Sequence, residues 1–437
     1  MEFDEIGGGR SSIEEAVAAA LSYLDSVDPA SAADAQVGWE GLRSISPPAG
    51  PTQNSVQTFL WLHLSEIADE SDRAWDIARA LADLLDRLGH ARYADIARSA
   101  RTRTLLESSD VSERQQQMLD AVEESGIGPP NTDLITWQET PEGAEAAVAG
   151  LIGETLEVAT IAGEFAPTRI DGPPLRQSAL AAKRRRLTDS VLRSERWGGV
   201  LLEQLLDHRM TLWTTYSPPR VELYRDLAGT VHDAAEPAYS CVRRLEGMLA
   251  ILGDGVELTD RGYLPRAVVE RAVATLWRPS EWPFPPGEEI DTAPVLRVRR
   301  LLRRLGLVRR HHGRLLPTAQ ARGMSADRMW TMLLDRFVGA DYHPDTIAAE
   351  VVFAEIARGG RPSDTTGLLT EILTAEGWTH RDGGGEGEPV PVESVESLAD
   401  DVLADITALA RLDSPEGKRL AAALLRHRLL HTQIPAL

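Results

Sequence analysis

A short stretch of this chain concentrates side chains that bind anions. Residues 296–318, LRVRRLLRRLGLVRRHHGRLLPT, contain eight arginines, two histidines and no acidic residue. The acid-free window extends from Thr292 to Ala326 and holds nine arginines in 35 residues, whereas the whole chain has a formal net charge of −21. Guanidinium groups form forked hydrogen bonds with phosphate oxygens and fit the edge of guanine. The window therefore predicts a surface that binds a polyanion.

The first half of this window has the periodicity of an amphipathic helix. On a helical wheel with about 100° per residue, one arc is apolar and should face the core of the domain. It consists of Val295, Val298, Leu301, Leu302 and Leu305. The opposite arc contains Leu296 and five arginines, namely Arg297, Arg299, Arg300, Arg303 and Arg304. We therefore expect all five guanidinium groups to point away from the protein.

The second half of the window predicts a β-hairpin. Two short arms that contain apolar residues flank His312-Gly313, a pair that favours a tight turn. This hairpin places five more basic residues beside the helix, namely Arg309, Arg310, His311, His312 and Arg314. The ten arginines and histidines of the helix and the hairpin are the nucleic-acid-binding residues that the sequence predicts.

The elements before this helix suggest the fold that would position it. The sequence predicts a helix within 237–255, a short extended piece within 256–265, a helix within 265–277, and then the arginine-rich helix within 293–306. The order helix, strand, helix, helix, hairpin is that of a winged helix-turn-helix, which we expect over residues 236–325. In such DNA binders the third helix enters the major groove, and the wing touches the backbone or the minor groove.

Three other interpretations of the arginines remain open. Exposed helix faces are commonly charged, so the arginines could simply be in contact with solvent. Among the 46 basic residues only Lys183 and Lys418 are lysine, which fits the codon usage of a GC-rich genome. That usage explains arginine in place of lysine but leaves the absence of Asp and Glu unexplained. Outside the window the chain is strongly acidic, so its own carboxylates could bind the basic face. Winged helices also bind proteins.

The rest of the sequence predicts a mainly α-helical protein of several domains. We expect an N-terminal helical domain over 1–128, a mostly helical middle region over 129–235, the winged-helix module over 236–325 and a C-terminal helical region over 326–437. The boundary near 128 rests on the run Gly-Ile-Gly-Pro-Pro, because prolines interrupt helices. Within the middle region, TDLITWQET alternates in a way that fits a short strand.

Chemistry other than anion binding has little support in the sequence. His427 and His431 are four residues apart and could share a metal ion, although histidines at a fraying helix end explain them better. Phosphate-binding loops, zinc-protease helices, nucleophile elbows and dinucleotide fingerprints are not found. Cys241 is the only cysteine, which excludes an internal disulfide. We therefore expect no enzyme, no cofactor and no metal.

Several stretches together resemble a family of uncharacterised actinobacterial proteins. VQTFLWLHLSEIAD and GIGPPNTDLITW resemble the N-terminal half of that family. LAILGDGVELTDRGYLPRAVVERAV and VLRVRRLLRRLGLVRRHHGRLLPTAQAR resemble its C-terminal half, in which L-T-x-x-G-Y-L-P precedes a winged-helix-like module. The resemblance covers most of the chain except about 155–235. It implies the architecture and a basic hairpin, and it implies no catalytic residues.

Two functions follow as hypotheses. The first is a nucleic-acid-binding protein, regulatory or associated with defence or mobile elements, that binds double-stranded DNA through the third helix and the basic wing. The second is a non-enzymatic helical scaffold or adaptor whose winged helix contacts an acidic protein. The sequence has neither a secretion signal nor a membrane-spanning stretch, so we expect a cytoplasmic location and no membrane partner. The oligomeric state is not predicted by the sequence.

Overall fold

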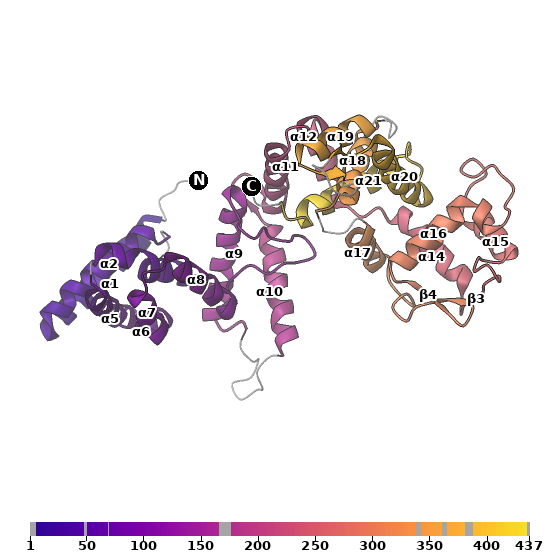
Figure 1. The fold of residues 1–437 in the computed structure, drawn as a ribbon. Coiled ribbons are helices and arrows are strands. Elements are labelled where there is room, and N and C mark those ends of the chain that lie inside the picture. The colour runs from indigo at the N-terminus through magenta and orange to yellow at the C-terminus, as the bar shows by residue number, and fades with distance from the viewer. Residues whose placement is uncertain are drawn as a thin grey trace. The chain divides into compact units, whose positions relative to one another are not determined.

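The computed structural model is mainly helical, as the sequence predicts (Figure 1). It describes residues 6–47, 50–68, 70–165, 176–337, 342–360, 365–380 and 388–434. The chain divides into two compact units. The first unit comprises residues 1–130 and 149–188, and the second unit comprises residues 131–148 and 189–437. The four domains expected from the sequence stay a prediction.

The first unit is built from short and medium helices. They are α1 (Ile6–Val27), α2 (Pro29–Ile45), α3 (Gln53–Thr58), the π-helical turn η1 (Phe59–His63), α4 (Leu64–Ile67), α5 (Ser71–Arg87), α6 (Ala91–Arg98), α7 (Ala100–Glu107) and α8 (Val111–Ser125). The unit division falls inside α9 (Gly143–Ile161) and α10 (Gln177–Leu192). Helices α2 and α5 form the most extensive contact. Gly38 permits it, because a Cβ atom there would lie only 3.0 Å from the Cβ of Leu81.

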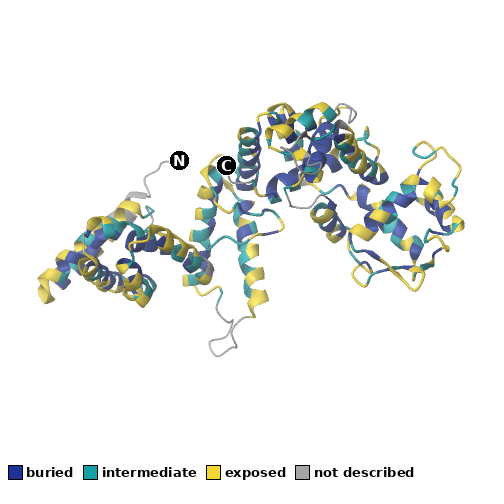
Figure 2. Cartoon of the chain, viewed as in Figure 1, coloured by how far each residue is buried: buried dark blue, intermediate teal, exposed yellow. Residues whose placement is uncertain are grey.

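The second unit contains a helical core and a smaller module. The core comprises α11 (Leu201–Tyr216), α12 (Arg220–Tyr224), α13 (Ala228–His232), the 3-10 turn η2 (Asp233–Ala235), α17 (Ala326–Phe337), α18 (Pro344–Arg358), α19 (Thr365–Ala375), α20 (Val392–Leu409) and α21 (Pro415–His431). Two antiparallel strand pairs accompany it, β1 (Glu195–Arg196) with β2 (Gly199–Val200), and β6 (Thr379–His380) with β7 (Glu388–Pro389). Every residue from Thr346 to Ala357 in α18 is buried, and α19, α20 and α21 all contact α18 (Figure 2). A helix that is buried on all sides marks the centre of a core.

The module is made of three helices and a small sheet. It contains α14 (Tyr239–Leu252), β3 (Val256–Glu257), α15 (Arg266–Leu276), the 3-10 turn η3 (Glu289–Asp291), α16 (Ala293–Arg304), β4 (Val308–His311) and β5 (Arg314–Pro317). The strands form an antiparallel sheet in the order β3-β5-β4. His312 and Gly313 both have positive φ angles, 45° and 76°, as a two-residue type I′ hairpin turn requires. The elements thus occur in the order that the sequence predicts.

The strand expected within TDLITWQET is not present, and this prediction is wrong. The segment is irregular because its backbone bonds to other partners than a strand. The amide of Thr136 donates to the carbonyl of Leu430 at the end of α21, at 3.0 Å. The amide of Gln138 donates to the carboxylate of Glu145, at 2.8 Å. In the part of the chain that the structure describes, no helix is long and apolar enough to cross a membrane.

Candidate nucleic-acid interface

Helix α16 is anchored by its apolar arc, as expected. Val295, Val298, Leu301 and Leu302 are buried, and Leu305 at the helix end is fully buried. The helix begins after Thr292 and has Pro294 in its first turn, where a missing amide hydrogen leaves no helical bond unmade. The five arginines of the opposite arc, however, do not share one environment.

One flank of α16 lies against the acidic helix α20. A guanidinium nitrogen of Arg297 lies 3.1 Å from the carboxylate of Asp401, and one of Arg304 lies 2.8 Å from the carboxylate of Asp405. The guanidinium of Arg304 also stacks over the ring of Phe337, at 5.1 Å from its centroid. The side chain of Arg297 is only 29% exposed, so the expectation that it points away from the protein is wrong. Arg304 stays exposed, although it is paired with Asp405. On the wheel they stand next to Leu301, at the edge of the apolar arc where α20 contacts α16.

The other flank is held by a buried carboxylate. The Nε atom of Arg299 lies 2.5 Å from Glu289, whose side chain is fully buried, and Arg299 also donates to the carbonyl of Gly262 at 3.1 Å. Burial raises the pKa of Glu289, and the amide of Leu264 and the guanidinium of Arg299 oppose that rise. The prediction that Arg299 points away from the protein is therefore wrong as well, because Arg299 neutralises a carboxylate inside the module.

Arg300 and Arg303 occupy the middle of the arginine arc, and both are exposed. Neither forms an ion pair with any carboxylate in the described residues. Leu296, which the wheel places in the same arc, is buried at 7% exposure. The protein therefore covers the beginning of this face. In its C-terminal half Arg300 and Arg303 are open to solvent, beside Arg304, which binds Asp405.

The hairpin continues the basic face beyond Gly306. All five of its predicted residues are exposed, namely Arg309, Arg310, His311, His312 and Arg314. Arg314 donates to the carbonyl of Gly255 at 2.9 Å and stands opposite Glu257 in the register of β5 with β3. The rings of His311 and His312 meet edge to face, with centroids 4.0 Å apart.

Four of the predicted residues are thus exposed cations without a bound acid. They are Arg300, Arg303, Arg309 and Arg310, and we call them the open arginines. Within the described ranges, no Asp or Glu lies at ion-pair distance from any of them. Because α16 and β4 are consecutive and in contact, the open arginines belong to one continuous part of the module.

His427 and His431 lie in the last two turns of α21, but this helix end is packed against the core, so the explanation by a fraying end is wrong. Their rings lie 4.1 Å apart beside a cavity of about 300 Å³, which Trp330 and Leu334 also line. Burial lowers the pKa of His427 to about 3 and that of His431 to about 4. His427 lies 3.4 Å from Asp335. Among the described residues, no three His, Cys, Asp or Glu side chains are placed to hold a metal ion.

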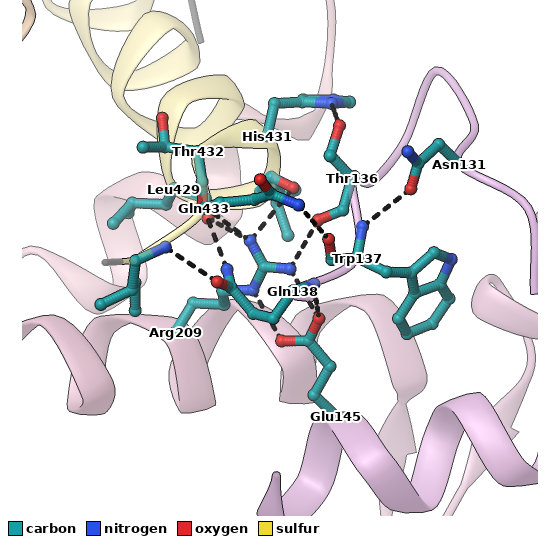
Figure 3. A network of polar contacts seen from close by, with 12 residues as sticks. Asn131, Thr136, Trp137, Gln138, Glu145, Arg209, Leu429, His431, Thr432 and Gln433 are labelled. Carbon is teal, nitrogen blue, oxygen red and sulfur yellow. Dashed lines mark hydrogen bonds and ion pairs between the residues drawn. The ribbon is translucent and has the colours of Figure 1, made fainter. Parts of the chain in front are cut away.

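The sequence analysis missed a buried arginine of α11, Arg209, which binds the end of α21 (Figure 3). Arg209 forms two hydrogen bonds with the carboxylate of Glu145, at 2.7 and 2.9 Å, and both side chains are fully buried. Arg209 also donates to the carbonyls of Thr136, Leu429, Leu430 and Thr432, at 2.7–3.4 Å. It thus satisfies carbonyls that the last turn of a helix leaves unpaired. The sequence indicates the burial of Arg209 only through helical periodicity. Arg209 lies on the same helix face as the buried residues Leu202, Leu205, Leu206 and Trp213.

A second buried network surrounds Glu350 in α18. Its carboxylate is bound by Arg220 at 2.8 Å and by Arg428 at 3.1 Å, and it accepts a hydrogen bond from the hydroxyl of Tyr224. The two guanidinium groups outweigh burial and lower the pKa of Glu350 to about 2. These charges hold α12, α18 and α21 together.

Apart from these buried networks, the arrangement brings together a basic helix end and a basic hairpin, which can bind an anion electrostatically. In comparisons with known proteins, no family model, no curated protein and no solved structure matches this chain.

Proposed function

We propose that this protein is a non-enzymatic nucleic-acid-binding protein that contacts double-stranded DNA through a winged helix-turn-helix module at residues 236–325. The order of elements, the three-stranded sheet and the hairpin after α16 support the module. In this assignment α16 is the third helix and the β4–β5 hairpin is the wing.

The observation that carries the proposal is the state of the open arginines. Acidic residues outnumber basic ones by 21 in this chain, and carboxylates bind the flanking Arg297, Arg299 and Arg304. The open arginines nevertheless remain exposed and without a carboxylate partner among the described residues, and all four lie within residues 300–310, at a helix end and in a hairpin. Phosphates are the ligands that such clustered guanidinium groups favour.

Fluorescence anisotropy with a labelled 20-base-pair duplex tests this proposal. We expect binding by the wild-type protein at about 50 mM salt and a loss of at least about 100-fold in Arg300→Glu with Arg303→Glu, because two phosphate contacts become repulsive. The matched control is Arg79→Glu with Arg196→Glu, which reverses two exposed arginines outside the module. It should bind within about threefold of the wild type. Equal binding by the Arg300/Arg303 variant and the control would remove this surface from the site.

One observation favours the scaffold or adaptor function as the second candidate. Helix α16 already binds an acidic helix of its own chain through Arg297 and Arg304. A partner with a similar acidic helix could bind the open arginines in the same way. If the wild-type protein binds no duplex at low salt, this second function becomes the better explanation.

A further inference from the structure

Helix α16 is covered at the end that would face base pairs. In helix-turn-helix proteins, the N-terminal residues of the recognition helix contact the base edges. Among residues 293–299, only Ala293 is exposed, and Val295, Leu296 and Val298 are buried. Arg297 and Arg299, which could read guanine, are bound to Asp401 and Glu289. The side chains that remain free at this end can form no hydrogen bond with a base.

The element that covers this end is part of the core. Helix α20 contacts α18, α19, α14 and α21 as well as α16. Val395 and Ile406 in α20 are fully buried, and Ala399 is buried at 4% exposure. Helix α14 of the module also contacts α17, α20 and α21, so α16 cannot leave α20 unless the whole module separates from the core. The cover on α16 is therefore a fixed feature of the second unit.

The residue types on the exposed part do not favour base recognition either. Residues 293–318 contain no Asn and no Gln, the side chains that pair with the edge of adenine. The open arginines lie in the last two turns of α16 and in β4, where a winged helix meets the DNA backbone. Guanidinium groups in such positions bind phosphate oxygens, which are the same in every sequence.

From these observations we infer that the protein holds the sugar–phosphate backbone of double-stranded DNA and does not discriminate between base sequences. This inference rests on the proposed function, because it specifies how the same surface would bind its ligand. In this inference the open arginines bind the phosphates, and the beginning of α16 makes no contact with the bases.

The test compares three 20-base-pair duplexes by anisotropy at one salt concentration. One has A·T pairs only, one has G·C pairs only, and one carries the sequence that the protein enriches most from a pool of random duplexes. We expect dissociation constants that agree within about threefold, whereas a sequence-specific protein separates its site from other DNA by about 1,000-fold or more. A larger preference for one duplex, above about threefold, would overturn this inference and leave the proposed function intact. Binding to none of the three would overturn both.

A pair of matched variants tests the same inference along α16. Arg297→Gln and Arg303→Gln make the same chemical change at the covered and at the exposed end of one helix. We expect Arg303→Gln to weaken binding of all three duplexes about five- to tenfold, as the loss of one phosphate contact does, and Arg297→Gln to change it less than about twofold. An equal or larger loss in Arg297→Gln would show that the covered end takes part in binding and would overturn the inference.

Discussion

Arginine has two separate tasks in this protein, and burial distinguishes them. Arg209, Arg220 and Arg428 are almost completely buried, and each is bound to a buried glutamate. A charge inside a protein is tolerated only when a partner and further hydrogen bonds replace its water. The open arginines have no such partner among the described residues and stay in solvent. The same side chain therefore stabilises the fold in one place and is available to a ligand in another.

The buried pair of Arg209 and Glu145 gives the first prediction. Arg209→Met keeps most of the side-chain volume but leaves a buried carboxylate and several carbonyls at the end of α21 without donors. We expect the free energy of unfolding, measured by urea denaturation, to fall by about 3–5 kcal/mol. Arg209→Met combined with Glu145→Gln should lose less than the single variant, because the uncompensated charge is then gone. A loss below about 1 kcal/mol in the single variant would contradict the buried network.

The neighbouring histidines His427 and His431 give a prediction about pH. Because burial lowers the pKa of His427 to about 3 and of His431 to about 4, the unfolded chain binds protons below pH 6.5 that the folded protein does not bind. Stability is therefore complete above pH 6.5 and decreases as the pH falls toward 4, by about 1.4 kcal/mol per pH unit for each histidine.

Unfolding titrations at several pH values check this effect. His427→Gln with His431→Gln should flatten the dependence of the unfolding free energy on pH between 6.5 and 4. Glu350, whose pKa is lowered to about 2, contributes stability that is lost at still lower pH, and it is the same in both proteins. Identical pH dependences for the wild type and the variant would show that the two imidazoles are not buried in neutral form.

The sequence could predict which residues form the basic cluster but not which of them are exposed. All five arginines of α16 look equivalent on a helical wheel, because the wheel shows only the direction of each side chain around the helix axis. It does not show which other elements pack beside the helix. The carboxylates that bind Arg297 and Arg304 come from Asp401 and Asp405, about a hundred residues further along the chain. Contacts between such distant segments are set by tertiary structure, and no local pattern encodes them.

At the scale of elements, the contact with α20 determines how much of the basic face of α16 a ligand can reach. Asp401 and Asp405 bring two negative charges beside the basic face, and the side chain of Asp401 is 76% exposed. At ordinary salt, charges act over a distance of about 10 Å, so these two carboxylates weaken the attraction between α16 and a phosphate chain.

This leads to a prediction about affinity. Asp401→Asn with Asp405→Asn should bind duplex DNA at least about threefold more tightly than the wild type at low salt, because two repelling charges disappear and two arginines lose their acidic partners. The matched control, Glu393→Gln with Glu396→Gln, removes two exposed acids from the start of the same helix and should have a smaller effect. An unchanged or weaker affinity in the Asp401/Asp405 variant would contradict this electrostatic account.

Elements that a short sequence pattern defines, such as a turn or a regular apolar period, were predicted from the sequence. Some elements without such a clear pattern were missed. The hairpin was found because His312-Gly313 favours its turn, and α16 because its apolar period is regular. The stretch HARYADIARSARTRTLLE, in contrast, is divided into α6 and α7 at Ser99, whose hydroxyl accepts a hydrogen bond from the amide of Thr102. Helix α2 was not predicted, although Asp28 caps it and Pro29 begins it.

At the scale of the molecule, the helical class followed from the sequence, but the division into two units did not. The second unit joins residues 131–148 to the chain after 188, because Glu145 and Thr136 bind Arg209 and the end of α21. A segment that returns to a distant part of the chain leaves no mark in its own composition. The net charge of −21 also hides the basic surface, since an average over 437 residues says nothing about where the cations lie.

The most direct test of the central claim is the salt dependence of duplex binding, because it counts phosphate contacts. If the four open arginines bind phosphates, the logarithm of the association constant should fall against the logarithm of salt concentration with a slope of about −3.6. Changing Arg300, Arg303, Arg309 or Arg310 singly to Gln should each make the slope about 0.9 less steep. A wild-type slope near zero, or slopes that do not change in the four variants, would contradict the account.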